Sequence, residues 1–189
     1  LAWSGDTLQQ VVKNHPMKAT NPHISVLGHI VPEEFRSLMS ELSTANGFGN
    51  RFLHYFSIRS KDLPSGGGLP DWERHATDIK RKLQRASEPW EYKRNGEAEA
   101  LWTSVYSDLT ATTEGLLGNM TARNRAHALR LQVLYAALDG AKEITTEHVL
   151  GSIAVVQYNE RTLKFIYGDR TGNRNADKII AELRRYKFV

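Results

Sequence analysis

The stretch Ala122–Gly140, ARNRAHALRLQVLYAALDG, decides the fold class of this chain. Small and apolar residues recur in it at helical spacing, and it ends on Asp139-Gly140, where a glycine is suited to stop a helix. A helix of this kind is stable in water only when other elements cover its apolar stripe. The residues that we expect to face a core are Ala122, Ala126, Leu129, Val133 and Ala137.

Further segments after residue 70 share this period. One of them opens with Thr145-Thr146-Glu147, the composition of a helix cap. Residues 71–168 are therefore predicted to form a helical bundle or lid, and 169–189 to end in a helix compatible with the start of a winged-helix segment. The predicted stripes are Trp72, Ala76, Ile79 and Leu83; Leu101, Trp102, Val105 and Leu109; Val149, Ile153, Val156 and Leu163; and Ala176, Ile179, Ile180 and Leu183.

Residues 1–62 have a different pattern. The segment 24–30, ISVLGHI, is apolar on both faces, and 51–59, RFLHYFSIR, is rich in aromatic residues, so both are predicted to be strands. Between them, Pro32 followed by two glutamates predicts a helix start. This strand–helix–strand order is typical of a parallel sheet. The predicted stripe of that helix is Phe35, Leu38, Met39 and Leu42, and Trp3, Leu8, Val11 and Val12 predict a short amphipathic helix before the first strand.

The fold class that we expect is therefore mainly α with a small β part: a truncated strand–helix–strand fragment followed by an α-helical bundle. The glycine- and proline-rich residues 63–70 form the predicted linker between the two. Two strands with apolar faces cannot stand alone, because both sheet edges would stay unpaired. Either the helices cover the strands or the rest of the sheet is missing. The first residue is a leucine, which also favours a piece of a longer polypeptide.

Composition narrows the classes of function. The chain has no cysteine, which excludes disulfides and thiolate metal sites, and its seven histidines lack metal-ligand spacing, so we expect no metal site. No apolar run has the length of a membrane span, and the first residues are polar, unlike a signal peptide, so we expect a cytoplasmic protein. The net charge of +4 is concentrated in residues 73–94 and 161–189. Such basic segments indicate either a polyanion partner or solvated helix faces.

Several segments of the chain share a pattern with known proteins. They are AWSGDTL at 2–8, HISVLGHI at 23–30, ANGFGNRFL at 45–53, RSK at 59–61, TAR at 121–123, LRL at 129–131, YAALD at 135–139 and the helix around Tyr158. Together they resemble one family of P-loop ATPase-like proteins from phages, prophages and plasmids, which are often fused to primase domains. The resemblance covers nearly the whole chain and is most specific around residues 45–53.

The resemblance implies a RecA-like core similar to that of hexameric replicative helicases. It implies ATP and magnesium as cofactors of the intact protein, DNA bound without sequence preference as a partner, and a homo-oligomeric ring. In that family the phosphate-binding loop and the acidic magnesium strand lie N-terminal to the segments present here, so the upstream part of the same ATPase would be a partner of this chain. The expected function is the C-terminal portion of a helicase-like DNA-replication ATPase.

The chain departs from the family in lacking a phosphate-binding loop. That loop requires G-x-x-x-x-G-K-[ST] between a strand and a helix, because backbone amides and the lysine must surround the phosphates. The glycines at 66–68 are followed by Leu69-Pro70, with no lysine. We therefore expect no ATP hydrolysis by these 189 residues alone.

The resemblance still assigns roles to three residues of the first 62. His29, at the end of the first predicted strand, resembles a sensor of the terminal phosphate; alternatively, it is hydrogen-bonded within its loop. Arg51 follows a two-glycine turn and resembles an arginine finger, which stabilises charge in phosphoryl transfer. Its alternative is an arginine that closes the turn on carbonyl groups or pairs with Glu33, Glu34 or Glu41. Arg59 is a second finger candidate, or part of a basic loop.

Other residues are candidates for nucleotide contact. Arg123 and Arg130 lie seven apart on one predicted helix, with His127 between them, and resemble a second sensor; alternatively, both face solvent. The turn before Arg51 would let the backbone approach a ligand closely. Its candidate residues are Asn46, Gly47, Gly49 and Asn50. A rival function from a different class is a non-catalytic helical DNA-binding or adaptor module.

Overall fold

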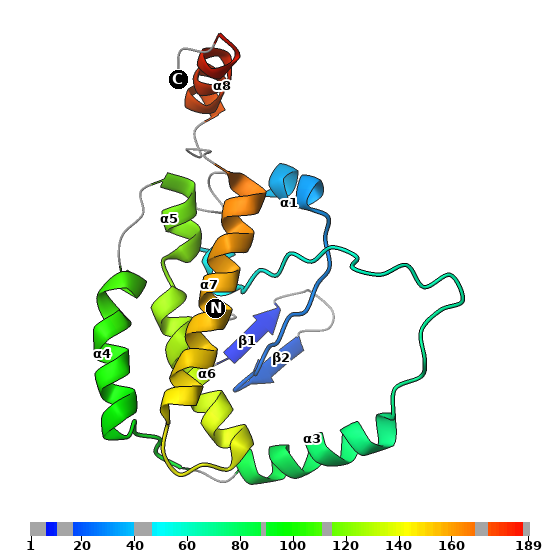
Figure 1. The fold of residues 1–189 in the computed structure, drawn as a ribbon, viewed down its shortest axis with the longest axis vertical. Helices are drawn as coiled ribbons and strands as arrows, with labels where there is room; N and C mark the ends of the chain where they lie inside the picture. Colours follow the sequence, from blue (N-terminus) through cyan, green and yellow to red (C-terminus); the bar gives the residue numbers. More distant parts are fainter. Residues whose placement is uncertain are drawn as a thin grey trace. The chain divides into compact units, whose positions relative to one another are not determined.

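A computed structural model of the chain describes residues 7–10, 17–39, 47–87, 90–110, 115–168 and 174–186. This part of the chain is mainly helical with one small antiparallel hairpin, as Figure 1 shows. The predicted class, mainly α with a small β part, is therefore confirmed. The chain divides into two compact units, residues 1–35 and 36–189.

The hairpin stands where the sequence predicted a helix. Strand β1 (Thr7–Gln10) pairs antiparallel with β2 (Met17–Thr20), with Thr7 opposite Thr20 and Gln10 opposite Met17. The helix prediction is wrong for these residues, because Met17 and Ala19 alternate with polar residues at the period of a strand. Three residues of the predicted helix stripe, Trp3, Val11 and Val12, lie outside the described residues.

The two predicted strands do not form in the described part of the chain. Residues 22–31 have no regular secondary structure, and 53–60 run extended without a strand partner. Residues Gly49–Arg51 instead form a short 3-10 turn, η1. Strand structure requires a neighbouring strand to complete the backbone ladder, and the only described ladder is β1–β2. The prediction of strands at 24–30 and 51–59 is therefore wrong for this structure.

The helix predicted between them is present but short. Helix α1 (Pro32–Leu38) begins at the predicted proline, with Glu33 and Glu34 in its first turn. Acidic side chains there interact favourably with the helix dipole. The helix ends before Met39, Leu42 lies outside the described residues, and α1 has no buried residue.

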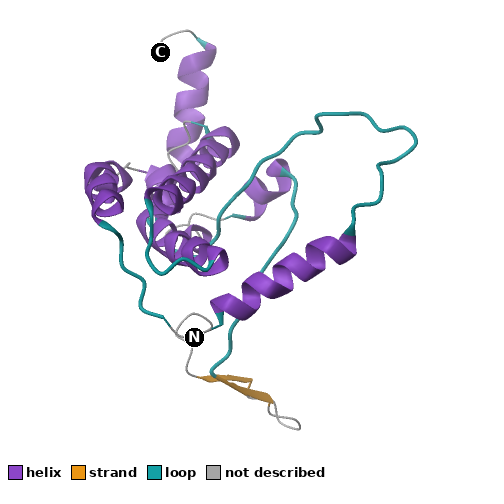
Figure 2. Ribbon diagram, turned by 60° about the horizontal axis from the view of Figure 1, so that its bottom comes forward, coloured by secondary structure: helices purple, strands orange, loops and turns teal. Residues whose placement is uncertain are grey.

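Four helices form the core of the second unit: α4 (Gly96–Thr110), α5 (Gly115–Thr121), α6 (Asn124–Asp139) and α7 (Thr146–Tyr167). Helices α6 and α7 lie side by side, and α4 and α5 pack against α7 (Figures 1 and 2). A buried apolar cluster joins α4, α6, α7 and the residue before the α7 cap. It consists of Ala98, Trp102, Ala128, Ala136, Ile144, Val149, Ile153 and Val156.

Helix α7 matches its prediction closely. Thr145 is the N-cap residue, and its backbone N–H donates to Nδ1 of His148 at 3.0 Å, which supplies an acceptor for a helix-end donor. All four residues of its predicted stripe are buried: Val149, Ile153, Val156 and Leu163.

Helix α6 buries a different face from the one predicted. Of the predicted stripe only Ala137 is buried, while Leu129 and Val133 are exposed. The buried face carries Gln132 instead, whose side chain accepts from Arg94 Nε at 2.9 Å and donates to Ser152 Oγ at 3.3 Å. A fully hydrogen-bonded polar side chain can be buried at little cost. The sequence pattern therefore predicted this helix correctly but not which of its faces is buried.

Two further helices are strongly amphipathic and expose their apolar stripes. Helix α3 (Trp72–Ala86) starts at Asp71, whose carboxylate accepts from the backbone N–H of Arg74 at 3.0 Å. Its Trp72, Ile79 and Leu83 are exposed, as are Ile179 and Leu183 of α8 (Arg174–Arg185). The two helices were therefore predicted correctly from their apolar periodicity, but their apolar stripes are exposed instead of buried as expected. Among the described residues, no helix combines the length and the hydropathy needed to cross a bilayer.

Candidate functional site

The turn 47–51 lies close against the helical bundle. Gly47 has a φ of +75°, a backbone conformation that favours glycine, and Nη1 of Arg51 donates to its carbonyl oxygen. Gly49 is buried, and a Cβ added to it would lie 2.5 Å from Sδ of Met120 in α5. The glycines at 47 and 49 thus allow the tight turn and its close approach to α5.

Asn50 links this turn to two helices. Its Nδ2 donates to the carbonyl oxygen of Asn119 in α5 at 3.0 Å, and its own carbonyl oxygen accepts from Nε2 of His127 in α6 at 2.9 Å. Both Asn50 and His127 are 8% exposed. Because a carbonyl can only accept, Nε2 of His127 carries the hydrogen in this contact.

The extended residues 52–58 are bonded to α7 at alternate positions. The backbone N–H of His54 donates to Oδ1 of Asn159 at 2.7 Å, and Nδ1 of the same histidine lies 3.2 Å from that oxygen. Two residues on, the N–H of Phe56 donates to Oγ1 of Thr162 at 3.2 Å, and its carbonyl accepts from the hydroxyl of Tyr158. One edge of the segment is therefore hydrogen-bonded to helix side chains, in place of a neighbouring strand.

Aromatic rings strengthen this contact. Tyr55 stacks on Tyr158 with the ring centroids 5.8 Å apart, and Phe56 stacks on Phe165 at 4.2 Å. Such pairs contribute roughly 0.5–1.5 kcal/mol each beyond the area that they bury. The segment is held along α7 by both polar and apolar contacts.

The polar side chains at this contact form one cluster, the His54–His127 cluster: His54, Asn50, His127, Asn124 and Asn159. Asn159 connects its parts, because Nδ2 of Asn159 also donates to Oδ1 of Asn124 at 3.3 Å. Three chain segments therefore meet in it: residues 50–54, the start of α6 and the middle of α7.

Both histidines of the cluster are held neutral by their surroundings. Burial is the main cause that lowers the pKa of His127; the hydrogen bond to Asn50 opposes this, and the positive charges of Arg130 and Arg123 lower it further. Burial also lowers the pKa of His54, against the hydrogen bond to Asn159 and with a smaller lowering by His127. Among the described residues, the charges that lower the pKa of His127 belong to Arg130 and Arg123, so this end of the cluster is suited to lie beside an anion.

The structure brings together most of the candidate residues. Arg123 and Arg130 lie near His127, and through it near Asn50 and the turn with Gly47, Gly49 and Arg51. Arg130 is exposed and Arg123 half-buried. The guanidinium of Arg51 is bonded to the Gly47 carbonyl, as its alternative interpretation expected. Its role as a finger stays a prediction.

Three candidates remain: His29, Arg59 and Asn46. His29 is exposed and follows no strand, and it belongs to the other unit of the chain. Arg59 is exposed, with Nε 3.1 Å from the Lys61 carbonyl oxygen and 3.3 Å from a carboxylate oxygen of Asp62. Asn46 lies outside the described residues.

Sequence reasoning did not assign a role to His54, Asn124 or Asn159. A signal was present: Asn159 and Thr162 lie three apart, within the apolar stripe that runs from Val156 to Leu163. Polar residues that interrupt a buried stripe require hydrogen-bond partners, so their spacing predicts a polar contact on that helix face.

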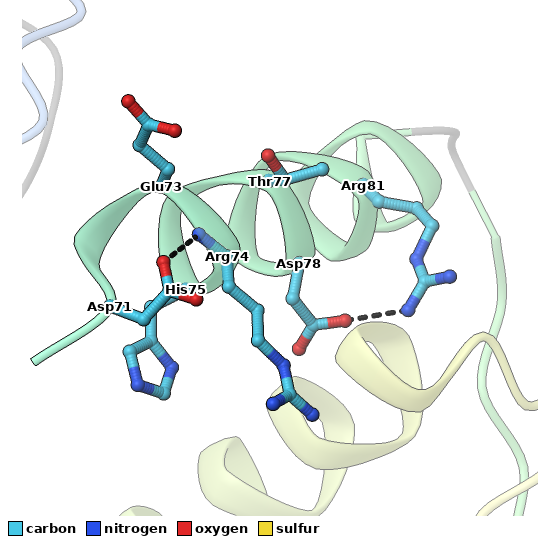
Figure 3. Close-up of a pocket in the computed structure, with 7 residues that line it drawn as sticks. All are labelled: Asp71, Glu73, Arg74, His75, Thr77, Asp78 and Arg81. Carbon is cyan, nitrogen blue, oxygen red and sulfur yellow. Dashed lines mark hydrogen bonds and ion pairs between the residues drawn. The ribbon is translucent and has the colours of Figure 1, made fainter.

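A shallow hollow on α3 is a weaker candidate. Figure 3 shows its lining residues, all from residues 71–81. Three of these side chains already make hydrogen bonds within the same segment. The Asp71 carboxylate caps the start of α3 by accepting from the backbone N–H of Arg74, and the carboxylate of Asp78 lies 2.6 Å from Nη2 of Arg81. In the described part of the chain, no group of three or more histidines and carboxylates could hold a metal ion.

No family model matches the chain, and neither a curated protein nor a solved structure matches it. The function is therefore inferred from the His54–His127 cluster, the charge around it and the resemblance of the quoted segments.

Proposed function

We propose that this chain is the C-terminal portion of a helicase-like DNA-replication ATPase of the phage and mobile-element type, a cytoplasmic protein that works as a ring. It supplies arginines to a nucleotide held by the upstream part of the same polypeptide. The phosphate-binding loop and the carboxylates that hold magnesium are assigned to that upstream part.

The hydrogen bond between His127 and the Asn50 carbonyl is the observation that carries the proposal. It joins two segments 77 residues apart in sequence, the turn of Arg51 and the helix of Arg123 and Arg130. Both belong to the segments that resemble the ATPase family. A movement of the turn would therefore be transmitted directly to the helical bundle, as a nucleotide sensor requires.

The chemistry of these arginines fits a phosphate group. Guanidinium groups bind phosphate oxygens in a planar, two-pronged geometry and stay charged at every pH that proteins tolerate. The positive charges of Arg130 and Arg123 act on His127 and lower its pKa, so both arginines lie close enough to the cluster to act on a ligand there. Arg51 would act on the γ-phosphate of its own or a neighbouring subunit.

The extended segments support the finer fold proposal, a RecA-like sheet of which this chain holds one edge. One edge of residues 52–58 is hydrogen-bonded to α7. On the opposite edge, none of the described residues makes a hydrogen bond with the backbone of Leu53, Tyr55 or Ser57. Neighbouring residues of a strand direct their backbone groups to opposite edges. The second edge is thus suited to receive a strand of the upstream part.

ATP hydrolysis tests the proposal. A polypeptide extended N-terminally through its phosphate-binding loop is expected to hydrolyse ATP, and DNA is expected to stimulate it, whereas residues 1–189 alone are expected to show no turnover. Phosphate release with and without single-stranded DNA measures both. An extended polypeptide that binds ATP but never hydrolyses it would contradict the proposal and favour the adaptor function.

The rival function is a non-catalytic helical module that binds DNA or a partner protein. The observation that favours it is the exposure of basic residues on α3, namely Arg74, Lys80 and Arg85, on a helix that also exposes Trp72. Positive side chains bind the DNA backbone without reading its sequence.

DNA binding by residues 1–189 is expected to weaken with salt and to be indifferent to sequence. The double substitution Arg74→Glu, Lys80→Glu is expected to weaken binding about tenfold or more at low salt. It is also expected to lower the slope of log affinity against log salt by about 0.9 for each lost phosphate contact. Fluorescence anisotropy with a labelled oligonucleotide at several salt concentrations measures both quantities.

The matched control places the same charge change elsewhere. Lys18→Glu, Lys142→Glu gives the same net charge as the α3 variant, but at two exposed lysines outside both basic segments, and it should leave the affinity within about twofold of that of the unsubstituted protein. If the control weakens binding as much as the α3 variant, the binding follows net charge and α3 is not the DNA-facing helix.

A further inference from the structure

Helix α3 carries an apolar stripe that is open to solvent. Its members Trp72, Ile79 and Leu83 are 69%, 56% and 56% exposed, and Ala76 between them is exposed as well. They follow one another at spacings of three or four residues, so they lie along one side of the helix. Large apolar side chains gathered on an exposed side indicate a surface that binds a partner.

A different side of α3 rests on the bundle. Asp78, Lys82 and Ala86, which follow one another at every fourth residue, are half-buried. Helix α3 contacts α6, and a Cβ added to Gly140 at the end of α6 would lie 3.5 Å from Cδ of Arg85. Contact through this side holds α3 on α6 and leaves the stripe uncovered by the described helices.

Basic side chains border the stripe. Successive residues of an α-helix lie about 100° apart around its axis, so Lys80 and Lys82 lie on opposite sides of the stripe. The helix has five Lys/Arg against two Asp/Glu, a balance of +3. Among the described residues, no carboxylate pairs with Arg74, Lys80 or Arg85. The polar part of α3 therefore carries positive charge that an anionic partner would neutralise.

We propose that α3 binds the surface of an anionic lipid bilayer. The helix lies in the plane of the headgroups, with Trp72, Ile79 and Leu83 inserted toward the acyl chains. The lysines that border the stripe reach the lipid phosphates. The proposal concerns these 189 residues themselves and does not rest on ATP hydrolysis.

The combination of stripe and charge identifies the partner. A helix with a narrow apolar stripe, a strongly charged polar face and low overall hydropathy is typical of one that lies in a membrane interface. Tryptophan prefers that interface, and lysine stems extend along apolar surface while their charges stay in water. DNA is bound chiefly through its phosphates, so the basic residues alone would serve it and the stripe would stay exposed.

Vesicle flotation tests the proposal with residues 1–189. The protein is expected to float with vesicles made of equal parts of phosphatidylcholine and phosphatidylglycerol. Its partition into vesicles of phosphatidylcholine alone is expected to be weaker by about tenfold or more, since each basic residue near an anionic surface adds about fivefold.

A neutral substitution of the stripe separates lipid from DNA. Ile79→Gln, Leu83→Gln keeps the charge and the helix preference and is expected to lower the partition into anionic vesicles about 30-fold or more. Its affinity for single-stranded DNA and its circular dichroism should stay unchanged. The matched control is Ile58→Gln, Leu150→Gln, which removes two apolar side chains that are 77% and 55% exposed elsewhere and should leave the partition unchanged.

Tryptophan fluorescence places the helix at the bilayer. Anionic vesicles are expected to shift the emission of the protein to shorter wavelength, because Trp72 leaves water. Trp72→Phe is expected to remove most of this shift. Trp90→Phe should retain it, since Trp90 is 57% exposed but lies outside α3.

Three results would overturn the proposal. The protein could fail to float with the anionic vesicles, or the stripe variant could float as well as its control. The stripe variant could also lose lipid and DNA binding in parallel, which would make nucleic acid the partner of this side of α3.

Discussion

Arg51→Ala is expected to lower DNA-stimulated ATP hydrolysis by the N-terminally extended protein about 10³-fold or more, while nucleotide binding persists. An arginine finger acts on the charge that develops on the transferred phosphoryl group, so its loss affects turnover far more than ground-state binding. In the structure the guanidinium closes the turn on the Gly47 carbonyl. The finger role therefore requires the side chain to exchange that bond for a phosphate oxygen when nucleotide is bound.

Two controls separate chemistry from folding. Arg161→Ala removes an exposed arginine from α7 and should leave turnover unchanged. Arg51→Lys keeps the charge but loses the fork of the guanidinium, so a finger role predicts a large loss here too. If Arg51→Ala instead lowers the melting temperature and turnover in parallel, and Arg51→Lys restores both, Arg51 only closes the turn.

The sequence predicted helices well where apolar residues and caps agreed. Helix α7 combines the Thr145 cap with a stripe that is buried throughout, so period, start and orientation were all correct. In α6 the same reasoning gave the helix and its end at Gly140 but the wrong face, because Gln132 and His127 are buried with hydrogen-bond partners that come from other elements. Apolar periodicity alone cannot identify a buried polar face.

The β part shows a different limit of sequence reasoning. The composition of residues 24–30 and 51–59 favours strands, yet a strand forms only when a neighbour supplies its hydrogen bonds. In residues 52–58 the side chains of Asn159 and Thr162 supply them instead. The strand predicted at 51–59 is therefore wrong, because the partner of this segment could not be read from the segment itself.

The candidate site could be predicted in part. The resemblance selected Asn50, Arg123 and Arg130, which the structure places around His127. It did not select Asn159 or His54, since their roles arise only when α7 meets the extended segment, 105 residues away in sequence. Contacts of this separation depend on the fold, so local patterns cannot specify them.

Asn159 is the residue on which this contact depends most, and Asn159→Ala is expected to destabilise the chain by about 2–4 kcal/mol. Its side chain is 1% exposed and makes three hydrogen bonds, to the backbone and ring of His54 and to Asn124. Alanine would leave the His54 N–H and the Asn124 oxygen without these partners inside the protein, and an unsatisfied buried group costs about 1–3 kcal/mol. Chemical denaturation followed by circular dichroism measures the change.

Gln157→Ala is the matched control, because it removes an exposed amide two residues away on the same helix and should change stability by less than about 0.5 kcal/mol. Asn159→Asp adds a second comparison. Its carboxylate keeps an acceptor for His54 but loses the donor to Asn124, and its charge would raise the pKa of His54. Equal stabilities of Asn159→Ala and Gln157→Ala would contradict the assignment, since the extended segment would then be held by its contacts to Tyr158, Thr162 and Phe165 without Asn159.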